Sequence, residues 1–130
     1  MSIFNAPELA FLAEQKLGRL ATQAPDGTLQ NNPVGYFVRA EEGYIDIGVH
    51  GLGASRKFHN IQTAPQVSLV VDDLSTDHGW NVRGIEIRGR AEAIPDAEPP
   101  MPGYSRELIR IHPDRILSWG LAESSRRNVS

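Results

Sequence analysis

The feature that most constrains the fold of this chain is an alternation with a period of two over residues 83–93. One face of this segment would carry only apolar or small residues, namely Ile85, Ile87, Gly89 and Ala91. The opposite face would carry only charged residues, namely Glu86, Arg88, Arg90 and Glu92. This pattern is typical of a strand in an antiparallel sheet with one buried face. We therefore expect a sheet whose charged face lies in solvent or across a subunit interface.

Two short helices are expected beside this sheet. The first should begin after Asn5, in a capping-box pattern, and should end at Gly18. The second should follow Ser55, which is a good N-cap, and should bury Phe58 and Ile61. Both helices are too short to form a layer of their own, so they should pack against the sheet.

The remaining segments predict more strands. Residues 19–24 and 29–40 predict a hairpin around a PDGT turn, and Pro33 indicates an edge or a bulge in its second strand. Other expected strands are residues 44–48, 67–73 and 108–121, and the proline-rich residues 95–103 are expected to form a loop. Six or so strands with two short helices fit a small antiparallel barrel that is closed or nearly closed.

Length and composition narrow the possible functions. A chain of 130 residues forms one domain, which we place at residues 1–121, followed by a frayed C-terminal tail over residues 122–130. The net charge of −3 gives no general attraction to nucleic acid or to a membrane surface. No signal peptide or membrane span is recognisable, and the absence of cysteine excludes disulfides and thiol chemistry. We therefore expect a cytoplasmic protein that does not bind nucleic acid or a membrane.

The residue types that carry catalysis form no convincing constellation. The chain contains four histidines, His50, His59, His78 and His112. Their spacing is not that of metal ligands, so we predict no metal site. No serine lies in a nucleophile elbow, and Trp80 and Trp119 are explained by packing, although either could line a pocket for a flat ligand. No residue is therefore assigned a catalytic role.

One short motif does point to a ligand. Ser55 is followed by Arg56 and Lys57 in the first turn of the second helix. A helix N-terminus is already positive, so two adjacent cations there are unfavourable unless an anion lies on them. One interpretation is a solvated pair of surface cations. The other is a phosphate clamp made of helix N–H groups, a hydroxyl and two cationic side chains.

Three stretches resemble the pyridoxamine 5′-phosphate oxidase-like split β-barrel family: LATQAPDGTLQNNPVGYFV, IDIGVHGLGASRKFHNIQTAPQVSLVVDD and VRGIEIRGRAEAI. The resemblance extends over residues 6–121 and implies a mainly β fold, an FMN-binding-like antiparallel split β-barrel with two or so short helices. The closing IRIHPDRILSWGL and the short chain are similar to the actinobacterial branch that uses the deazaflavin coenzyme F420. Other members of the wider family use FMN and, in some lineages, haem or FAD.

The resemblance also implies a binding site. Ser55, Arg56 and Lys57 would hold the cofactor phosphate, with Asn60 nearby. The residues that would lie against the flat ring system are Asn32, Pro33 and Val34. The residues that would form the wall leading to the clamp are Gly48, Val49 and His50. In this family the cofactor lies between two protomers, so the resemblance implies a homodimer in which Trp119 closes the pocket from the partner subunit.

The resemblance favours an F420-dependent reductase that transfers a hydride to an activated, enone-type double bond of a small, hydrophobic or natural-product substrate. Two alternatives stay open: an FMN-dependent oxidoreductase of the same fold, and a protein that binds or carries a flavin or haem without turnover. Hydride transfer is the cofactor's own chemistry, so the lack of a catalytic constellation is expected. His50, Tyr36 or water could supply the accompanying proton, and the sequence does not choose among them.

Overall fold

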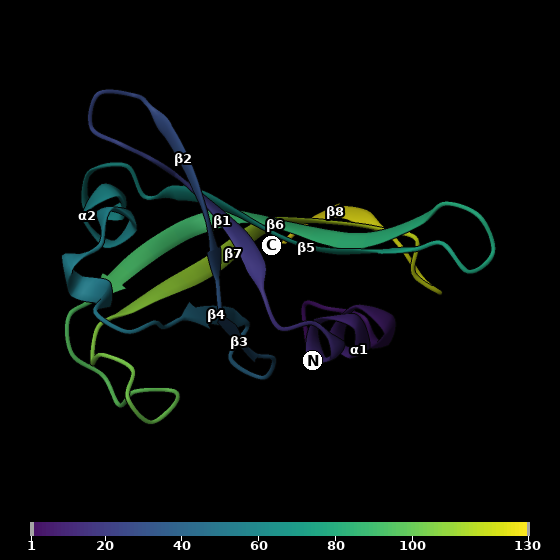
Figure 1. Ribbon diagram of the computed structural model, residues 1–130, viewed down its shortest axis with the longest axis horizontal. Helices are drawn as coiled ribbons and strands as arrows, with labels where there is room; N and C mark the ends of the chain where they lie inside the picture. The colour runs from purple at the N-terminus through teal and green to yellow at the C-terminus, as the bar shows by residue number, and fades with distance from the viewer. Residues whose placement is uncertain (1, 130) are drawn as a thin grey trace.

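The computed structural model describes residues 2–129 and contains one curled sheet, two α-helices and a 3₁₀ turn (Figure 1). The helical elements are α1 (Ala6–Glu14), η1 (Leu52–Ala54) and α2 (Arg56–Thr63). The strands of the first half are β1 (Gly18–Gln23), β2 (Leu29–Val34), β3 (Tyr36–Arg39) and β4 (Tyr44–Ile47). The strands of the second half are β5 (Gln66–Ser75), β6 (Asn81–Ile94), β7 (Leu108–Trp119) and β8 (Arg126–Asn128).

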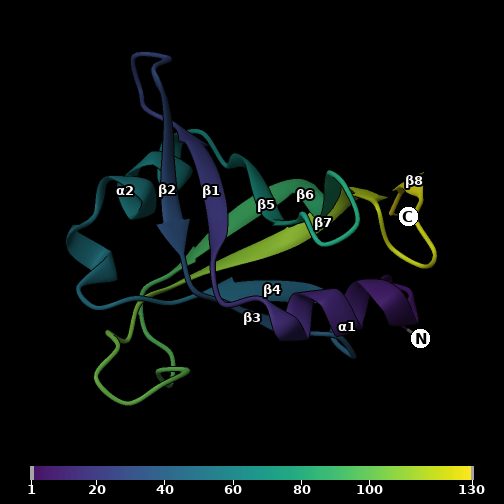
Figure 2. The same ribbon diagram turned by 45° about the vertical axis from the view of Figure 1, so that its right-hand side comes forward.

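The sheet is antiparallel throughout and has the strand order β2–β1–β5–β6–β7–β4–β3. β8 lies outside this order and pairs with residues 115–117 of β7, whereas β4 pairs with residues 109–111. β2 and β3 lie at opposite ends of this order, yet only Gly35 separates them along the chain. The sheet must therefore curl until its two ends meet at Gly35, and Figure 2 shows β2 running down to the β3–β4 pair. This is the mainly β, split β-barrel arrangement with two short helices that the sequence predicts.

The alternation predicted over residues 83–93 is confirmed, because one face of β6 lies in the core and the other lies at the surface. Ile85 and Ile87 are fully buried, whereas Arg88 and Arg90 on the opposite face are exposed. The largest fully buried hydrophobic side chains are Phe11, Leu20, Ile45, Ile47, Leu52, Leu69, Ile85, Ile87, Ile109, Ile111 and Ile116. They come from α1, η1 and five of the strands, so one core fills the inside of the curled sheet.

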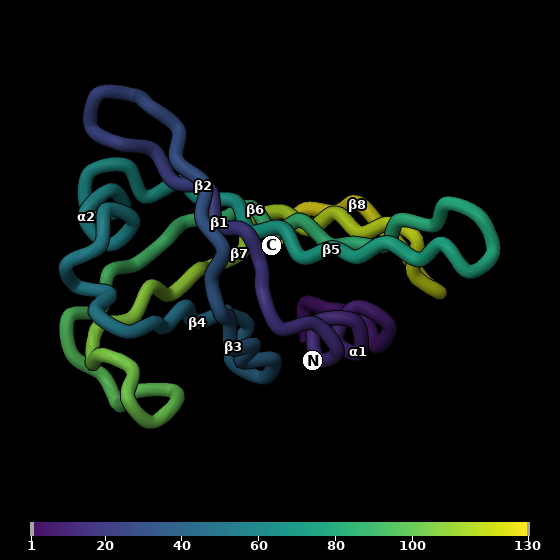
Figure 3. Tube along the Cα trace, viewed as in Figure 1, coloured from purple at the N-terminus to yellow at the C-terminus, as the bar shows by residue number. Residues whose placement is uncertain are grey.

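Two hairpins extend beyond this core. The β1–β2 hairpin projects near α2, and the β5–β6 hairpin projects from the opposite end of the sheet (Figure 3). α2 lies at the first end, while α1 lies beneath the sheet toward the second (Figure 1). Neither α-helix of the described chain is long and apolar enough to cross a membrane.

Two element boundaries differ from those expected from the sequence. α1 ends at Glu14 rather than at Gly18. Gly18 instead opens β1, where an added Cβ would lie 2.8 Å from Leu69 Cδ1, so close packing is the role of this glycine. The strand expected over residues 29–40 is divided at Gly35, because the chain passes there from one end of the sheet to the other.

The prediction of a frayed tail over residues 122–130 is wrong for the residues of β8. This strand pairs with β7, and the Arg127 guanidinium donates to both carboxylate oxygens of Glu8 at 2.7 and 3.0 Å. Glu8 belongs to α1, is fully buried and also accepts a hydrogen bond from Ser118 Oγ at 2.7 Å. An ion pair between the two ends of the chain therefore holds the last strand against the barrel.

Candidate functional site

The start of α2 is anchored by buried side chains on both sides of Ser55. Leu52 is fully buried and Phe58 is 7% exposed, so both fix this segment to the core. The Ser55 hydroxyl donates to the Leu52 carbonyl oxygen at 2.6 Å and accepts from the Phe58 N–H at 3.4 Å. Ser55 is thus the N-cap that the sequence predicts, and its hydroxyl already has partners within the chain.

Arg56 and Lys57 differ from most other cationic residues of this protein. Seven arginines form ion pairs with carboxylates, namely Arg19, Arg39, Arg83, Arg88, Arg106, Arg110 and Arg127. Among residues 2–129, no ion pair includes Arg56 or Lys57. Lys57 is also partly buried, and this burial lowers the pKa of its ammonium group below the ordinary value. A partly desolvated cation without a carboxylate partner is stabilised when an anion binds.

A cavity of about 630 Å³ lies between the start of α2 and β2. Its lining residues are Gln30, Asn31, Asn32, Pro33, Arg56 and Lys57. Asn32 and Pro33 are expected from the family resemblance to lie against the ring system of the cofactor. The structure brings them to the same cavity as Arg56 and Lys57. Val34, the third residue of that group, is 1% exposed and belongs to the core. Among residues 2–129, the side chains that line the cavity are three amides, two cations and one proline.

Asn60 contacts Gln30, which lines this cavity, but does not line the cavity itself. It lies one turn further along α2 and is 4% exposed. Its side-chain amide donates to Thr22 Oγ1 at 3.0 Å and to Gln30 Oε1 at 2.8 Å. Gln30 is a cavity residue that is not among the residues predicted from the sequence. The strand alternation could have found it, because residues 30 and 32 lie on the same face of β2.

The predicted wall at residues 48–50 is covered by the loop between β6 and β7. An added Cβ on Gly48 would lie 2.8 Å from Pro100 Cγ, so the loop packs directly on this glycine. The Val49 carbonyl oxygen accepts from Ser105 Oγ at 3.0 Å and from its N–H at 3.2 Å. An added Cβ on Gly35 would lie 4.0 Å from the Gly48 carbonyl oxygen. The wall therefore lies beside the point where β2 passes into β3.

His50 is exposed and is oriented by the same loop. Its Nδ1 lies 2.5 Å from the carbonyl oxygen of Gly103, so Nδ1 carries a proton and donates it to that oxygen. The His50 ring also meets the Tyr104 ring edge to face, with 4.8 Å between the centroids. The free nitrogen of this ring is therefore Nε2, which can bind or release a second proton.

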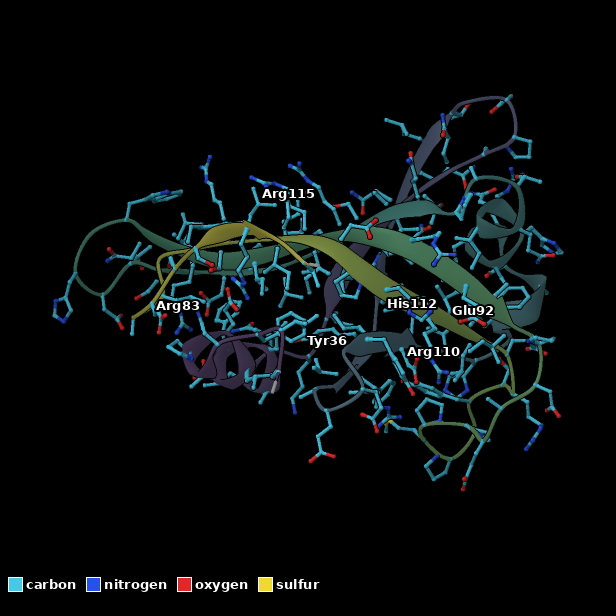
Figure 4. All side chains as sticks on the ribbon, turned by 180° about the vertical axis from the view of Figure 1, so that it is seen from behind. Tyr36, Arg83, Glu92, Arg110, His112 and Arg115 are labelled. Atoms are coloured by element: carbon cyan, nitrogen blue, oxygen red, sulfur yellow. The ribbon has the colours of Figure 1, made fainter. Side chains whose placement is uncertain are left out.

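Tyr36 lies in a different environment. Figure 4 shows it between α1 and the sheet, on the side away from α2. Its hydroxyl donates to the Leu12 carbonyl oxygen at 2.6 Å, and burial raises the pKa of Tyr36 to about 12. This hydroxyl is therefore engaged in holding the end of α1 and is a poor proton donor.

Trp119 lies at the end of β7 where β8 pairs, whereas α2 lies at the other end of the sheet (Figure 1). Its ring covers Gly84, where an added Cβ would overlap the indole. Within one chain, the structure does not bring Trp119 to the cavity. Its role in a partner's pocket stays a prediction.

Several charged groups elsewhere on the sheet are paired with one another. Asp46, 2% exposed, accepts from Arg110 Nε at 2.9 Å, and His112 Nε2 lies 3.0 Å from Glu92 Oε1. Arg110, His112 and Glu92 lie together where β6 and β7 run side by side (Figure 4). Within residues 2–129, no three His, Asp or Glu side chains are arranged to hold a metal ion. Arg56 and Lys57 are suited to a ligand because they line a cavity together and form no ion pair among residues 2–129.

The chain is similar to known proteins over most of its length. A family model described as pyridoxamine 5′-phosphate oxidase matches residues 8–120. A 5a,11a-dehydrotetracycline/5a,11a-dehydrooxytetracycline reductase of Streptomyces rimosus is 39% identical over 119 residues, which are 91% of this chain and 84% of the relative. A conserved hypothetical protein of Mycobacterium tuberculosis has a TM-score of 0.70 at 23% identity, covering 92% of this chain and 86% of its own. A FAD-binding protein of Mesorhizobium loti has a TM-score of 0.63 at 20% identity, covering 91% and 94%.

These similarities differ in what they show. The two solved structures share the curled barrel with this chain, and their low identity limits the comparison to the fold. The family model spans the barrel from α1 to the end of β7 and includes the whole of α2 and β2. The Streptomyces reductase is similar to this chain over almost the same length. The chain therefore belongs to the pyridoxamine 5′-phosphate oxidase-like split β-barrel family.

Proposed function

We propose that this protein is a reductase that uses the deazaflavin F420 to reduce an activated double bond of a polycyclic, tetracycline-type substrate. The observation that carries this proposal is the 39% identity over 119 residues to a dehydrotetracycline reductase. The prefix 5a,11a-dehydro in that relative's name denotes a double bond that a reductase removes. Reduction of such a double bond is the kind of reaction that the family resemblance favours.

The residues of the cavity fit the anionic part of such a cofactor. Arg56 and Lys57 would bind a phosphate or phosphodiester, helped by their own backbone N–H groups at the start of α2, since the Phe58 N–H already donates to Ser55 Oγ. Asn32 and Pro33 would lie beside it, and the wall at residues 48–50 would continue the site toward the ring system. When bound, the deazaflavin supplies the hydride. The protein's own tasks are then to bind, to orient and to keep water away.

For the proton that must follow the hydride, His50 is the side chain that we propose. Gly103 holds its Nδ1, so Nε2 is the atom that would carry the transferable proton. The Tyr36 hydroxyl is already bound to Leu12, and the pKa of Tyr36, raised to about 12 by burial, leaves it a weak acid. These contacts support His50 over Tyr36 as the general acid, with water as the remaining alternative.

We also propose that the protein acts as a homodimer with the cofactor site at the interface. The end of the β5–β6 hairpin exposes Leu74, Trp80 and Val82, at 47%, 76% and 43% of their surface. Leu74 and Val82 are cross-strand partners, and Trp80 lies in the connection just before β6, so the three exposed side chains belong to the same end of this hairpin. An apolar surface of this kind supports burial against a second copy, which could also bring Trp119 to the partner's cofactor.

Titration of the purified protein with F420 and with FMN, followed by fluorescence quenching, tests the choice of cofactor. We expect micromolar or tighter binding of F420 and weaker binding of FMN. Equal or tighter binding of FMN would favour an FMN-dependent oxidoreductase of the same fold.

Stopped-flow oxidation of the bound, reduced cofactor then tests turnover with a panel of quinones, imines and enones, including polycyclic enones. We expect the polycyclic enones to react fastest. If binding is tight but no compound oxidises the cofactor faster than buffer does, a carrier without turnover becomes the better description.

A further inference from the structure

We infer that Gln30 is a binding residue of the anion site and that buried Asn60 positions it. This inference rests on the proposed cofactor site beside Arg56 and Lys57 and assigns two further residues to it. The contacts of three elements carry it: β1 supplies Thr22, β2 supplies Gln30, and α2 supplies Asn60.

The hydrogen bonds of Asn60 determine which end of the Gln30 amide faces the cavity. An uncharged asparagine amide has two N–H donors on Nδ2. One donates to Thr22 Oγ1 at 3.0 Å and the other to Gln30 Oε1 at 2.8 Å. Gln30 therefore turns its oxygen toward Asn60. Its Nε2, which carries two N–H donors, is left for the cavity that Gln30 lines.

This orientation suits a ligand with acceptor atoms, and the neighbouring Arg56 and Lys57 favour an anionic one. A glutamine that presented its oxygen would repel a phosphate or carboxylate, whereas one that presents Nε2 can donate to it. The donor faces the same cavity as Arg56 and Lys57, so all three side chains offer N–H groups to one ligand. The ligand chemistry is thus an oxyanion with several acceptor oxygens, such as the phosphodiester of F420 or the phosphate of FMN.

Asn60 is well placed to keep this arrangement rigid. Asn60 is 4% exposed and Thr22 beside it is 2% exposed, so water does not compete for the hydrogen bond from Asn60 Nδ2 to Thr22 Oγ1. Asn60 belongs to the same short helix as Arg56 and Lys57, so one rigid element positions both the cations and the amide. Asn60 therefore acts as a positioning residue, and Gln30 as the residue that contacts the anion.

Two substitutions separate this role from a structural one. Gln30→Glu keeps the acceptor for Asn60 but removes the donor and adds a negative charge. Asn60→Asp offers only acceptors to Gln30, so the Gln30 amide should turn over and present its oxygen to the anion. Gln62→Glu is the matched control, because it adds the same charge to the exposed side of α2, outside the cavity.

The test is titration of the wild type and the three variants with inorganic pyrophosphate, F420 and FMN, with the side-chain amide signals of Gln30 followed by NMR. We expect Gln30→Glu and Asn60→Asp to weaken the ligand that the wild type binds by about tenfold or more, and Gln62→Glu to leave it nearly unchanged. The Gln30 NH₂ signals should shift on ligand addition in the wild type and in Gln62→Glu. In Asn60→Asp this shift should be lost.

The possible failures can be told apart. A wild type that binds F420 or FMN, with unchanged affinity in Gln30→Glu, would overturn this inference and leave the proposed function intact. A wild type that binds none of the three probes would overturn the proposed cofactor site, and the inference with it. If Asn60→Asp does not fold, the Gln30→Glu titration and the wild-type Gln30 signals still decide the outcome.

Discussion

At the scale of single residues, Lys57 places a positive charge at the start of a helix, where it is unfavourable unless an anion binds. Lys57 is partly buried and has no ion pair within the described chain. We expect Lys57→Ala to weaken cofactor binding by about 1.5–3 kcal/mol, the size of a hydrogen bond to a charged group. The free energy of unfolding without cofactor should stay level or rise, because an unfavourable contact with the helix dipole is removed. Fluorescence titration and thermal unfolding of the same variant measure the two effects. A variant that unfolds more easily but binds normally would contradict the clamp.

The protonation of Lys57 should also respond to the ligand. Burial lowers the pKa of Lys57 in the free protein, and a bound anion favours the charged form. Binding should therefore be accompanied by proton uptake, and affinity should fall as the pH rises through the lowered pKa. Titration calorimetry in two buffers with different ionisation enthalpies measures this uptake. No difference between the buffers in the alkaline range would place the anion away from Lys57.

The two candidate proton donors differ in their contacts, so their substitutions should differ in effect. We expect His50→Gln to slow turnover at saturating cofactor by at most roughly 10²–10⁴-fold, the usual range for a general acid. Tyr36→Phe should leave turnover nearly unchanged, because the hydroxyl that it removes is bound to Leu12. Single-turnover kinetics with reduced cofactor compare the two variants. A larger loss in Tyr36→Phe than in His50→Gln would reverse the assignment.

At the scale of secondary-structure elements, one ion pair joins β8 to α1. Glu8 is fully buried, and Arg127 is its ion-pair partner. We expect Arg127→Ala to lower the free energy of unfolding by about 3 kcal/mol, because it leaves a buried carboxylate without its partner. Arg126→Ala is the control, since the neighbouring Arg126 is exposed and should change stability by about 0.5 kcal/mol or less. Denaturant unfolding of both variants decides whether the tail is part of the fold.

The same contact predicts a dependence on pH. Burial by itself would raise the pKa of Glu8, but hydrogen bonds from Arg127, Ser118 and the Asn5 N–H outweigh it, so the pKa lies below the ordinary value. A carboxyl group with a lowered folded-state pKa stabilises the protein above its unfolded pKa, and this stabilisation is lost as the pH falls through the folded pKa. The difference in stability between the wild type and Arg127→Ala should therefore shrink in acid. A difference that stays constant down to the acid transition would assign the effect of Arg127 to packing.

At the scale of the whole molecule, the exposed end of the β5–β6 hairpin predicts a dimer. Trp80 is 76% exposed at the same end of the hairpin as Leu74 and Val82. We expect sedimentation to give twice the mass of the chain at micromolar concentration, and Trp80→Ser to shift the equilibrium toward monomer. Leu29→Ser is the control, because Leu29 is 77% exposed on the other hairpin. A monomeric wild type with cofactor bound would overturn the shared site.

The elements could be predicted wherever the sequence pattern is local. The alternation over residues 83–93, the hairpin turn and the N-caps at Asn5 and Ser55 depend on neighbouring residues, and the structure confirms them. The boundaries at Glu14 and Gly35 could not be predicted, because they depend on where distant strands pack. The pairing of Arg127 with Glu8 was missed for the same reason.

The sequence by itself determined the residue types of the candidate site: two adjacent cations after a good helix cap, and a run of amides on the strand before Pro33. Only the tertiary structure decided which of them meet. Curling of the sheet brings β2 against the start of α2, so Gln30 joins Arg56 and Lys57 while Val34 turns into the core. It also places the Tyr36 hydroxyl against the Leu12 carbonyl oxygen and Trp119 at the far end of β7. The physical reason is that strand alternation and helix capping act between near neighbours, whereas a binding site depends on contacts between segments that only the closed sheet brings together.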